Sequence, residues 1–135
     1  MHYVAGLGCR QNCPLSELRD LLQHTLTTHD LPLSALTALA SSEYKQGEPA
    51  LLQLASELQI PLYWLSSAQL QPYDARLSQH SELSRQLTGS AGVAEACALA
   101  QAEYLNGGRA MLLGPRQHNA RATCAIAIAP ITEPA

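Results

Sequence analysis

Two kinds of segment alternate along the chain, as its pattern of apolar and polar residues shows. Short apolar runs at Tyr3–Leu7, Leu36–Ser41 and Leu62–Leu65 are separated by longer segments in which apolar residues recur with a helical period. This alternation predicts βαβ units built around a mostly parallel sheet. The alanine content of the second run also fits a helix, so both assignments of that run stay open.

Two helices are predicted between these strands. The first begins near Pro14, which suits a first helical turn, and its apolar stripe consists of Leu15, Leu18, Leu22 and Leu26. The second opens at Glu48-Pro49 and ends before Pro61, and the residues expected to face inward are Leu51, Leu52, Ala55 and Leu58. Each helix therefore has one apolar face that can cover the sheet.

A longer helical region follows the third strand. Residues 71–79 are polar and predict a surface connection, and a short helix is expected at about 81–87. A glycine-rich turn, Thr88–Gly92, then leads into a long helix at Val93–Tyr104. The sequence Asn106-Gly107-Gly108 is typical of a helix end.

The chain closes with two further predicted strands, Ala110–Leu113 and Thr123–Ala129, whose short connection favours an antiparallel hairpin. Together the elements predict an α/β fold. We expect a single three-layer domain over residues 1–135, with a mostly parallel five-stranded sheet and a C-terminal antiparallel hairpin.

Composition shows what fills this domain. The chain has 135 residues, enough for one domain and too few for two of ordinary size. Hydrophobic residues make up 47% of it, but aromatic residues only 4%, and Phe is absent. Leu, Ala, Ile and Val must therefore fill the interior as a closely packed aliphatic core.

Charge and cysteine content exclude several classes of function. The net charge of -3 and the scattered basic residues argue against nucleic-acid binding. No segment is apolar for long enough to span a membrane and the N-terminus lacks a basic leader, so we expect a cytoplasmic protein without a membrane partner. The four cysteines should remain thiols there. Because Cys9 and Cys13 have no matching Cys or His pair, neither a metal site nor a cofactor is expected.

Candidate ligand-binding residues follow from the predicted topology. In an open α/β sheet, ligands bind beyond the carboxyl ends of the parallel strands, where loops and helix N-termini converge. At these positions the sequence places cations, hydroxyl groups and glycine amides, which suit a ligand rich in carboxylates. The selected residues are Gly8, Cys9, Arg10, Ser42, Lys45, Glu48, Ser66, Thr88, Gly89 and Ser90, with Glu95 in the helix that follows.

Each candidate also has a purely structural interpretation. Gly6 and Gly8 fit a tight turn after the first strand, and Ser90 fits a helix cap. Glu48 and Glu95 fall near helix N-termini, where a carboxylate stabilises the helix dipole. If the site is catalytic, these two glutamates are the candidate bases.

Motifs along the whole chain resemble those of the CobE/CbiG C-terminal family of cobalamin biosynthesis proteins. They are Val4-Ala5-Gly6-Leu7-Gly8-Cys9-Arg10, Ala40-Ser41-Ser42-Glu43-Tyr44-Lys45 followed by Glu48-Pro49, Pro61-Leu62 with Ser66, Gly92-Val93-Ala94-Glu95-Ala96, and Thr123-Cys124-Ala125-Ile126-Ala127. The chain departs from the family pattern at Glu43 and at Arg116, which stands where a Lys is common. Arg116 keeps the positive charge, so it joins the candidate ligand-binding residues.

The resemblance implies a role in building the corrin ring of vitamin B12, with a precorrin-type tetrapyrrole as ligand and other pathway enzymes as candidate partners. Larger family members carry N-terminal regions and open the ring A lactone of a cobalt-precorrin, releasing acetaldehyde. A chain of 135 residues has no room for those regions. It therefore resembles the stand-alone CobE type, for which the resemblance implies no defined reaction.

Three hypotheses therefore remain. The first is a binder, carrier or assisting factor that holds a precorrin through Arg10, Lys45 and nearby hydroxyl groups. The second is an enzyme that opens the lactone of the same ligand. The third is a small nucleotide-binding module that uses Gly6, Gly8 and Glu43, although its glycine fingerprint is incomplete.

Overall fold

The elements of the chain follow the predicted order closely. The computed structural model describes residues 2–10, 12–76, 93–114, 116–119 and 122–129. In chain order the elements are β1 (His2–Cys9), α1 (Leu15–Thr28), the 3-10 turn η1 (Leu33–Ala35), β2 (Leu36–Ser42), η2 (Glu43–Lys45), α2 (Pro49–Leu58), β3 (Leu62–Leu65), α3 (Ser67–Leu70), η3 (Gln71–Arg76), α5 (Val93–Asn106), β4 (Met111–Leu112), β5 (Gln117–His118) and β6 (Ala122–Ala129). The short helix predicted at about 81–87 and the Thr88–Gly92 turn lie outside the described residues.

The strands form one mixed sheet in the order β3-β2-β1-β6-β4, and β5 also pairs with β6. β1, β2 and β3 are parallel to one another, whereas β6 is antiparallel to β1, β4 and β5. The predicted α/β fold is confirmed, and the ambiguous second run is a strand. The sheet has six strands instead of five, and it is mixed because β6 inserts between β1 and β4.

The extra strand arises from the way the chain pairs with β6. After β4, the Leu113 N–H still donates to the Ile126 carbonyl at 2.8 Å, and then Gly114 takes a positive φ of 70°. Pairing resumes where Gln117 lies opposite Cys124. The segment predicted as one loop of a simple hairpin therefore contains a second short strand, β5.

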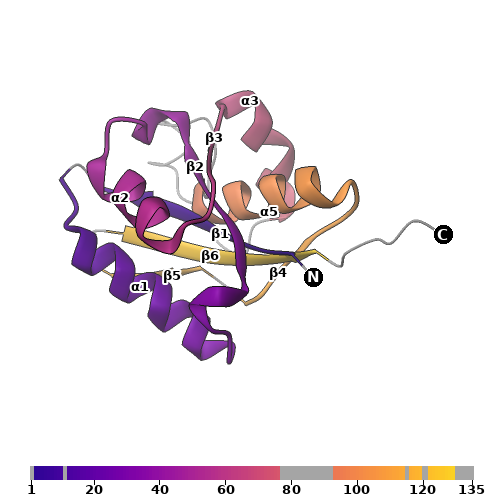
Figure 1. The fold of residues 1–135 in the computed structure, drawn as a ribbon. Helices are drawn as coiled ribbons and strands as arrows, with labels where there is room; N and C mark the ends of the chain where they lie inside the picture. The colour runs from indigo at the N-terminus through magenta and orange to yellow at the C-terminus, as the bar shows by residue number, and fades with distance from the viewer. Residues whose placement is uncertain (1, 11, 77–92, 115, 120–121, 130–135) are drawn as a thin grey trace.

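Helices cover both faces of the sheet (Figure 1). α1 and α2 pack on one face and are linked by a bidentate pair in which Arg19 donates to Glu57 at 2.8 Å. α5 covers the other face, and α3 lies against it at the β3 edge. Within the described ranges, no helix combines the length and the apolar character needed to cross a membrane.

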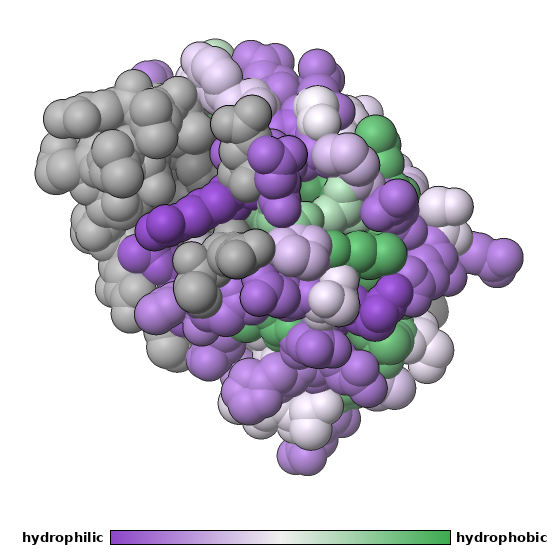
Figure 2. Space-filling model, turned by 90° about the vertical axis from the view of Figure 1, so that its left-hand side faces the viewer, coloured by the Kyte–Doolittle hydropathy of each residue, from purple (hydrophilic) through white to green (hydrophobic). Residues whose placement is uncertain are grey.

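The carboxyl ends of the parallel strands lead into the loops that carry the candidate site. β1 ends on the left-hand side of Figure 1, and Figure 2 shows that side face on. Hydrophilic residues surround a smaller hydrophobic area there. This distribution suits a surface that contacts a ligand with both polar and apolar parts.

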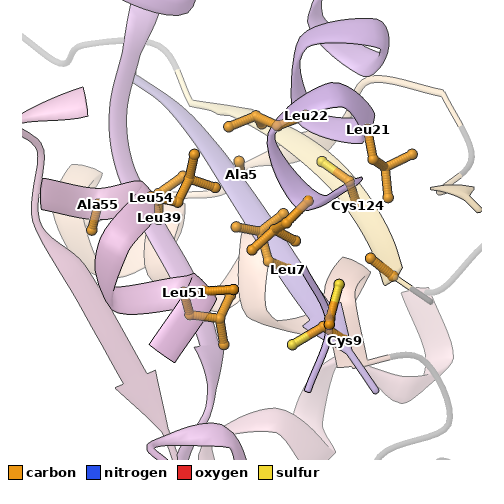
Figure 3. Packing of buried hydrophobic residues seen from close by; sticks show 14 of the residues in the cluster. Ala5, Leu7, Cys9, Leu21, Leu22, Leu39, Leu51, Leu54, Ala55 and Cys124 are labelled. Carbon is orange, nitrogen blue, oxygen red and sulfur yellow. The ribbon is translucent and has the colours of Figure 1, made fainter. Parts of the chain in front are cut away.

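Leucines from α1 and α2 meet the sheet in the larger of two hydrophobic clusters (Figure 3). On α2 the buried residues are Ala50, Leu51, Leu54 and Ala55. The prediction that Leu52 faces inward is wrong, because its side chain is 51% exposed. The helix begins at Pro49, and its inward face follows the spacing of Leu51, Leu54 and Ala55, which turns Leu52 to the opposite side.

α5 packs unusually close to the sheet because the residues between them are small. Its described residues from Ala94 to Ala102 are all buried, and most of them are alanines. A Cβ atom placed on Gly6 of β1 would lie 1.9 Å from the Ala94 carbonyl oxygen and 2.7 Å from the Ala98 nitrogen. Only glycine fits at this crossing, so Gly6 sets the distance between helix and strand.

Candidate functional site

The loops that follow β1 and β2 are joined by a buried carboxylate. Glu48, which precedes α2, is 9% exposed, and its Oε2 accepts a hydrogen bond of 3.0 Å from the Asn12 N–H. Asn12 has a positive φ of 64°, and the neighbouring Cys13 N–H closes a turn on the Arg10 carbonyl at 3.2 Å. Glu48 therefore fixes the conformation of the loop that presents Arg10.

Thiol, carboxylate and ammonium groups lie together at this junction. The pKa of the Cys9 thiol is raised from 9.0 to about 11, mainly by burial and also by the nearby Cys13 and Glu48, whereas Lys45 lowers it. The Cys9 thiol is therefore protonated at neutral pH and is a poor nucleophile. The charged groups that can act on a ligand here are Lys45 and the Glu48 carboxylate.

Arg10 extends the positive charge of this junction. It is the first residue after β1 and its side chain is exposed, whereas Lys45 is half-buried. We name the region of Cys9, Arg10, Lys45 and Glu48 the strand-end site. It brings together four of the residues selected from the sequence. Two loops that are joined by a hydrogen bond and that each carry a cation can bind carboxylate groups.

The predicted serines at the strand ends bind the backbone of their own chain. The Ser42 hydroxyl accepts a hydrogen bond from the Tyr44 N–H at 3.3 Å, which caps η2. Ser66 forms a capping box with Gln69 at the start of α3. Each hydroxyl therefore has a structural task that holds its loop in place.

A hydrogen bond joins Glu95 to the segment between β4 and β5. Glu95 is fully buried, and its Oε2 accepts a hydrogen bond of 3.2 Å from the Arg116 N–H. Glu95 belongs to the first turn of α5, whereas Glu48 precedes α2, and these two helices cover opposite faces of the sheet. The roles of Glu95 and Arg116 in ligand binding stay predictions.

The remaining selected residues have varied positions. A Cβ on Gly8 would meet no atom of the described residues within 4 Å, so among them space is open beside the end of β1. Glu43 is exposed in η2, and Thr88, Gly89 and Ser90 lie outside the described residues. In the part of the chain that the structure describes, no three His, Cys, Asp or Glu side chains gather in a way that could hold a metal ion.

Sequence reasoning missed two members of this region. Asn12 donates the hydrogen bond that joins the loops, and Cys13 is buried beside Cys9. The C-x3-C spacing placed Cys13 in the loop after β1, and this was the available signal for it. The role of Asn12 depends on its backbone N–H and left no signal in the side-chain pattern.

Known proteins with similar sequences come from cobalamin biosynthesis. The profile of the family described as cobalamin synthesis G C-terminus matches residues 3–127. Protein CobE of Sinorhizobium sp is 33% identical over 124 residues, which are 92% of this chain and 78% of that protein. Cobalt-precorrin-5A hydrolase of Salmonella typhimurium is 38% identical over 71 residues, which are 53% of this chain but only 20% of the hydrolase.

A solved structure agrees with these sequence matches. The crystal structure of CobE, a protein from the cobalamin (vitamin B12) biosynthetic pathway, superposes with a TM-score of 0.91. It is 45% identical in sequence, and the match covers 93% of this chain and 92% of the CobE chain. The family match over nearly the whole length and the shared fold lead to one conclusion: this chain is a cobalamin biosynthesis protein of the CobE/CbiG C-terminal family.

Proposed function

We propose that this protein binds a precorrin-type tetrapyrrole intermediate at the strand-end site and acts as a binder, carrier or assisting factor of cobalamin biosynthesis. One observation carries the proposal. The hydrogen bond between Asn12 and Glu48 holds the loops after β1 and β2 together, and the two cations Arg10 and Lys45 belong to these loops.

The chemistry of the ligand matches this arrangement. Precorrins carry several acetate and propionate groups around a broad apolar ring. Arg10 and Lys45 offer charge-assisted hydrogen bonds to such carboxylates. The hydrophobic area among hydrophilic residues in Figure 2 offers contact to the ring. The open space beside Gly8 allows a ligand to approach the backbone at the end of β1.

The binding of a carboxylated corrinoid tests the proposal directly. Cobyrinic acid is titrated into the protein by calorimetry, and we expect Arg10→Ala and Lys45→Ala each to cost about 1–3 kcal/mol of binding free energy, the range for hydrogen bonds to charged groups. Arg109→Ala is the matched control, because Arg109 is also exposed but follows the far end of α5.

Two results would count against the strand-end site. If the titration with cobyrinic acid gives neither heat nor a change in corrinoid absorbance, the protein does not bind this ligand and the proposed function is wrong. If Arg109→Ala and Lys45→Ala lose the same amount of binding free energy, the effect is one of overall charge and not of the strand-end site. The melting temperatures of the three variants should stay close to that of the wild type, because these side chains contribute little to the packed core.

Lactone hydrolysis is the second candidate function, and the sequence match to cobalt-precorrin-5A hydrolase favours it. Glu48 is the better placed base, since it lies beside Lys45, which could stabilise a developing oxyanion. The test is release of acetaldehyde from a ring A lactone precorrin by the purified protein. If the substrate binds and no acetaldehyde forms, binding without catalysis is the function.

A further inference from the structure

A tyrosine-lined groove lies on the α5 face of the sheet, away from the strand-end site. It has a volume of about 600 Å³ and is formed by β3, the α3–η3 segment and the second half of α5. Tyr63, Tyr73 and Tyr104 line it, which are three of the five tyrosines of a chain poor in aromatic residues. The volume is in the range of pockets that hold small organic ligands. In Figure 1 it corresponds to the region where α3 faces α5.

A buried amide without a partner belongs to the lining of this groove. Gln101 is 2% exposed, and within the described part of the chain its Nε2 has no hydrogen-bond partner although it is shielded from solvent. Buried amide donors are almost always paired, because leaving one unpaired costs free energy. An acceptor on a bound molecule would remove this cost.

The charge of the groove differs from that of the strand-end site. Glu103 is part of the lining, and it accepts hydrogen bonds from the Tyr73 hydroxyl at 3.1 Å and from the Ala110 N–H at 2.7 Å. Neither Lys nor Arg is among the described residues that line the groove. The described lining therefore offers no cation to a ligand carboxylate, whereas its aromatic residues can contact an uncharged ring.

We propose that this groove is a second ligand site, which binds a flat, uncharged, conjugated nitrogen heterocycle carrying a hydrogen-bond acceptor. The tyrosine rings supply surfaces for stacking, and the Gln101 Nε2 donates to the acceptor. The inference goes beyond the binding of carboxylated precorrins and does not depend on it. The ring could belong to a heteroaromatic nucleoside or to a tetrapyrrole without free carboxylates, and the experiment separates these two sources.

The Gln101 side-chain amide gives a direct readout in NMR spectra of isotope-labelled protein. Adenosine and cobinamide in its neutral dicyano form, a corrinoid whose side chains are amides, are titrated separately to millimolar concentration. We expect the Gln101 amide signals, assigned by their loss in Gln101→Leu, to shift with at least one ligand. Movement with adenosine assigns the groove to a nucleoside, and movement with cobinamide assigns it to the macrocycle. Signals that stay fixed with both ligands would overturn the proposal.

Variants separate a ligand-binding amide from a structural one. Gln101→Leu should weaken binding roughly tenfold while the protein stays at least as stable, because the variant removes an unpaired buried donor. Tyr104→Ala should weaken binding without unfolding the protein, since Tyr104 is 79% exposed. Gln53→Leu, on the exposed side of α2, is the control and should bind like the wild type. The proposal is contradicted if Gln101→Leu lowers the stability of the protein and Tyr104→Ala binds the ligand as tightly as the wild type.

The same variants distinguish the groove from the strand-end site. Cobyrinic acid binding that depends on Lys45 and not on Gln101 would support the proposed function, whatever the groove binds. If the protein binds adenosine in a way that depends on Gln101 but does not bind cobyrinic acid, the groove is a ligand site and the proposed function is wrong.

Discussion

Gly6 and Gly8 lie two residues apart on β1 and have opposite surroundings. A side chain on Gly6 would collide with the backbone of α5, whereas one on Gly8 would meet no atom within 4 Å. We expect Gly6→Ala to lower the free energy of unfolding by about 1–3 kcal/mol or more through overpacking. Gly8→Ala should change it by less than about 0.5 kcal/mol. Urea denaturation of the two variants measures both values.

Gly8→Ala also tests whether a ligand approaches the end of β1. If the space beside Gly8 is used for binding, the added methyl group should weaken cobyrinic acid binding while leaving stability unchanged. Equal unfolding free energies for Gly6→Ala and the wild type would show that α5 can move away from the sheet. From sequence alone the two glycines look alike, because the contact that separates them comes from a helix that is distant in the chain.

The buried thiols predict a loss of stability at alkaline pH. The pKa of the Cys9 thiol rises from 9.0 to about 11 on folding, and burial raises that of Cys124 to about 12. A raised pKa means that the folded protein holds the proton more tightly than the unfolded chain. The contribution of Cys9 is therefore complete below pH 9.0 and disappears as the pH rises through about 11.

Urea denaturation between pH 8 and pH 11 measures this effect, with pH values chosen about the thiol pKa. The unfolding free energy of the wild type should fall across this range, and that of Cys9→Ala should fall less. Cys97 and Cys124, whose thiol pKa values burial also raises, contribute to the fall that remains in Cys9→Ala. Parallel curves for wild type and Cys9→Ala would show that the Cys9 thiol is not desolvated in the folded protein.

At the scale of elements, Glu48 connects two βα loops that would otherwise be independent. Removing its carboxylate in Glu48→Ala leaves the Asn12 N–H without its acceptor, which should cost about 1–3 kcal/mol of stability. Glu48→Gln keeps an acceptor oxygen and should cost less. Glu43→Ala, in the same loop but exposed, is the control. Faster hydrogen exchange of the Asn12 amide in Glu48→Ala alone would confirm the link, and unchanged exchange would contradict it.

The predicted elements agree with the structure where the pattern is local. The start of α1 and both ends of β1 to β3 were placed within two residues, because apolar periodicity, Pro14 and the glycines act over short distances. β5 was missed because its two residues, Gln117 and His118, pair with β6 without an apolar pattern. Leu52 was misassigned because α2 is apolar on more than one side and only the packed structure selects the buried face.

At the scale of the molecule, topology grouped part of the candidate site in advance. Parallel strands with helical crossovers bring the loops after β1 and β2 to one edge, so Arg10, Lys45 and Glu48 could be grouped from the sequence. Glu95 was grouped with them because it lies near a helix N-terminus, and this grouping stays a prediction; the structure shows its Oε2 accepting a hydrogen bond from the Arg116 N–H. The tyrosine-lined groove gave no sequence signal, since Tyr63, Tyr73 and Tyr104 come from separate elements and meet only in the folded chain.

The two sites should respond differently to salt. Arg10 is exposed and Lys45 half-buried, so solvent ions screen their attraction to ligand carboxylates. Raising the ionic strength from about 0.01 M to about 0.1 M shortens the Debye length from about 30 Å to about 10 Å. The dissociation constant of cobyrinic acid should therefore increase over this range, and the slope against salt should be smaller in Lys45→Ala and Arg10→Ala.

Adenosine or cobinamide in the groove, which lacks Lys and Arg among its described lining residues, should bind with little dependence on salt. Salt-independent binding of cobyrinic acid would place its carboxylates away from both cations, and the strand-end site would then need another ligand.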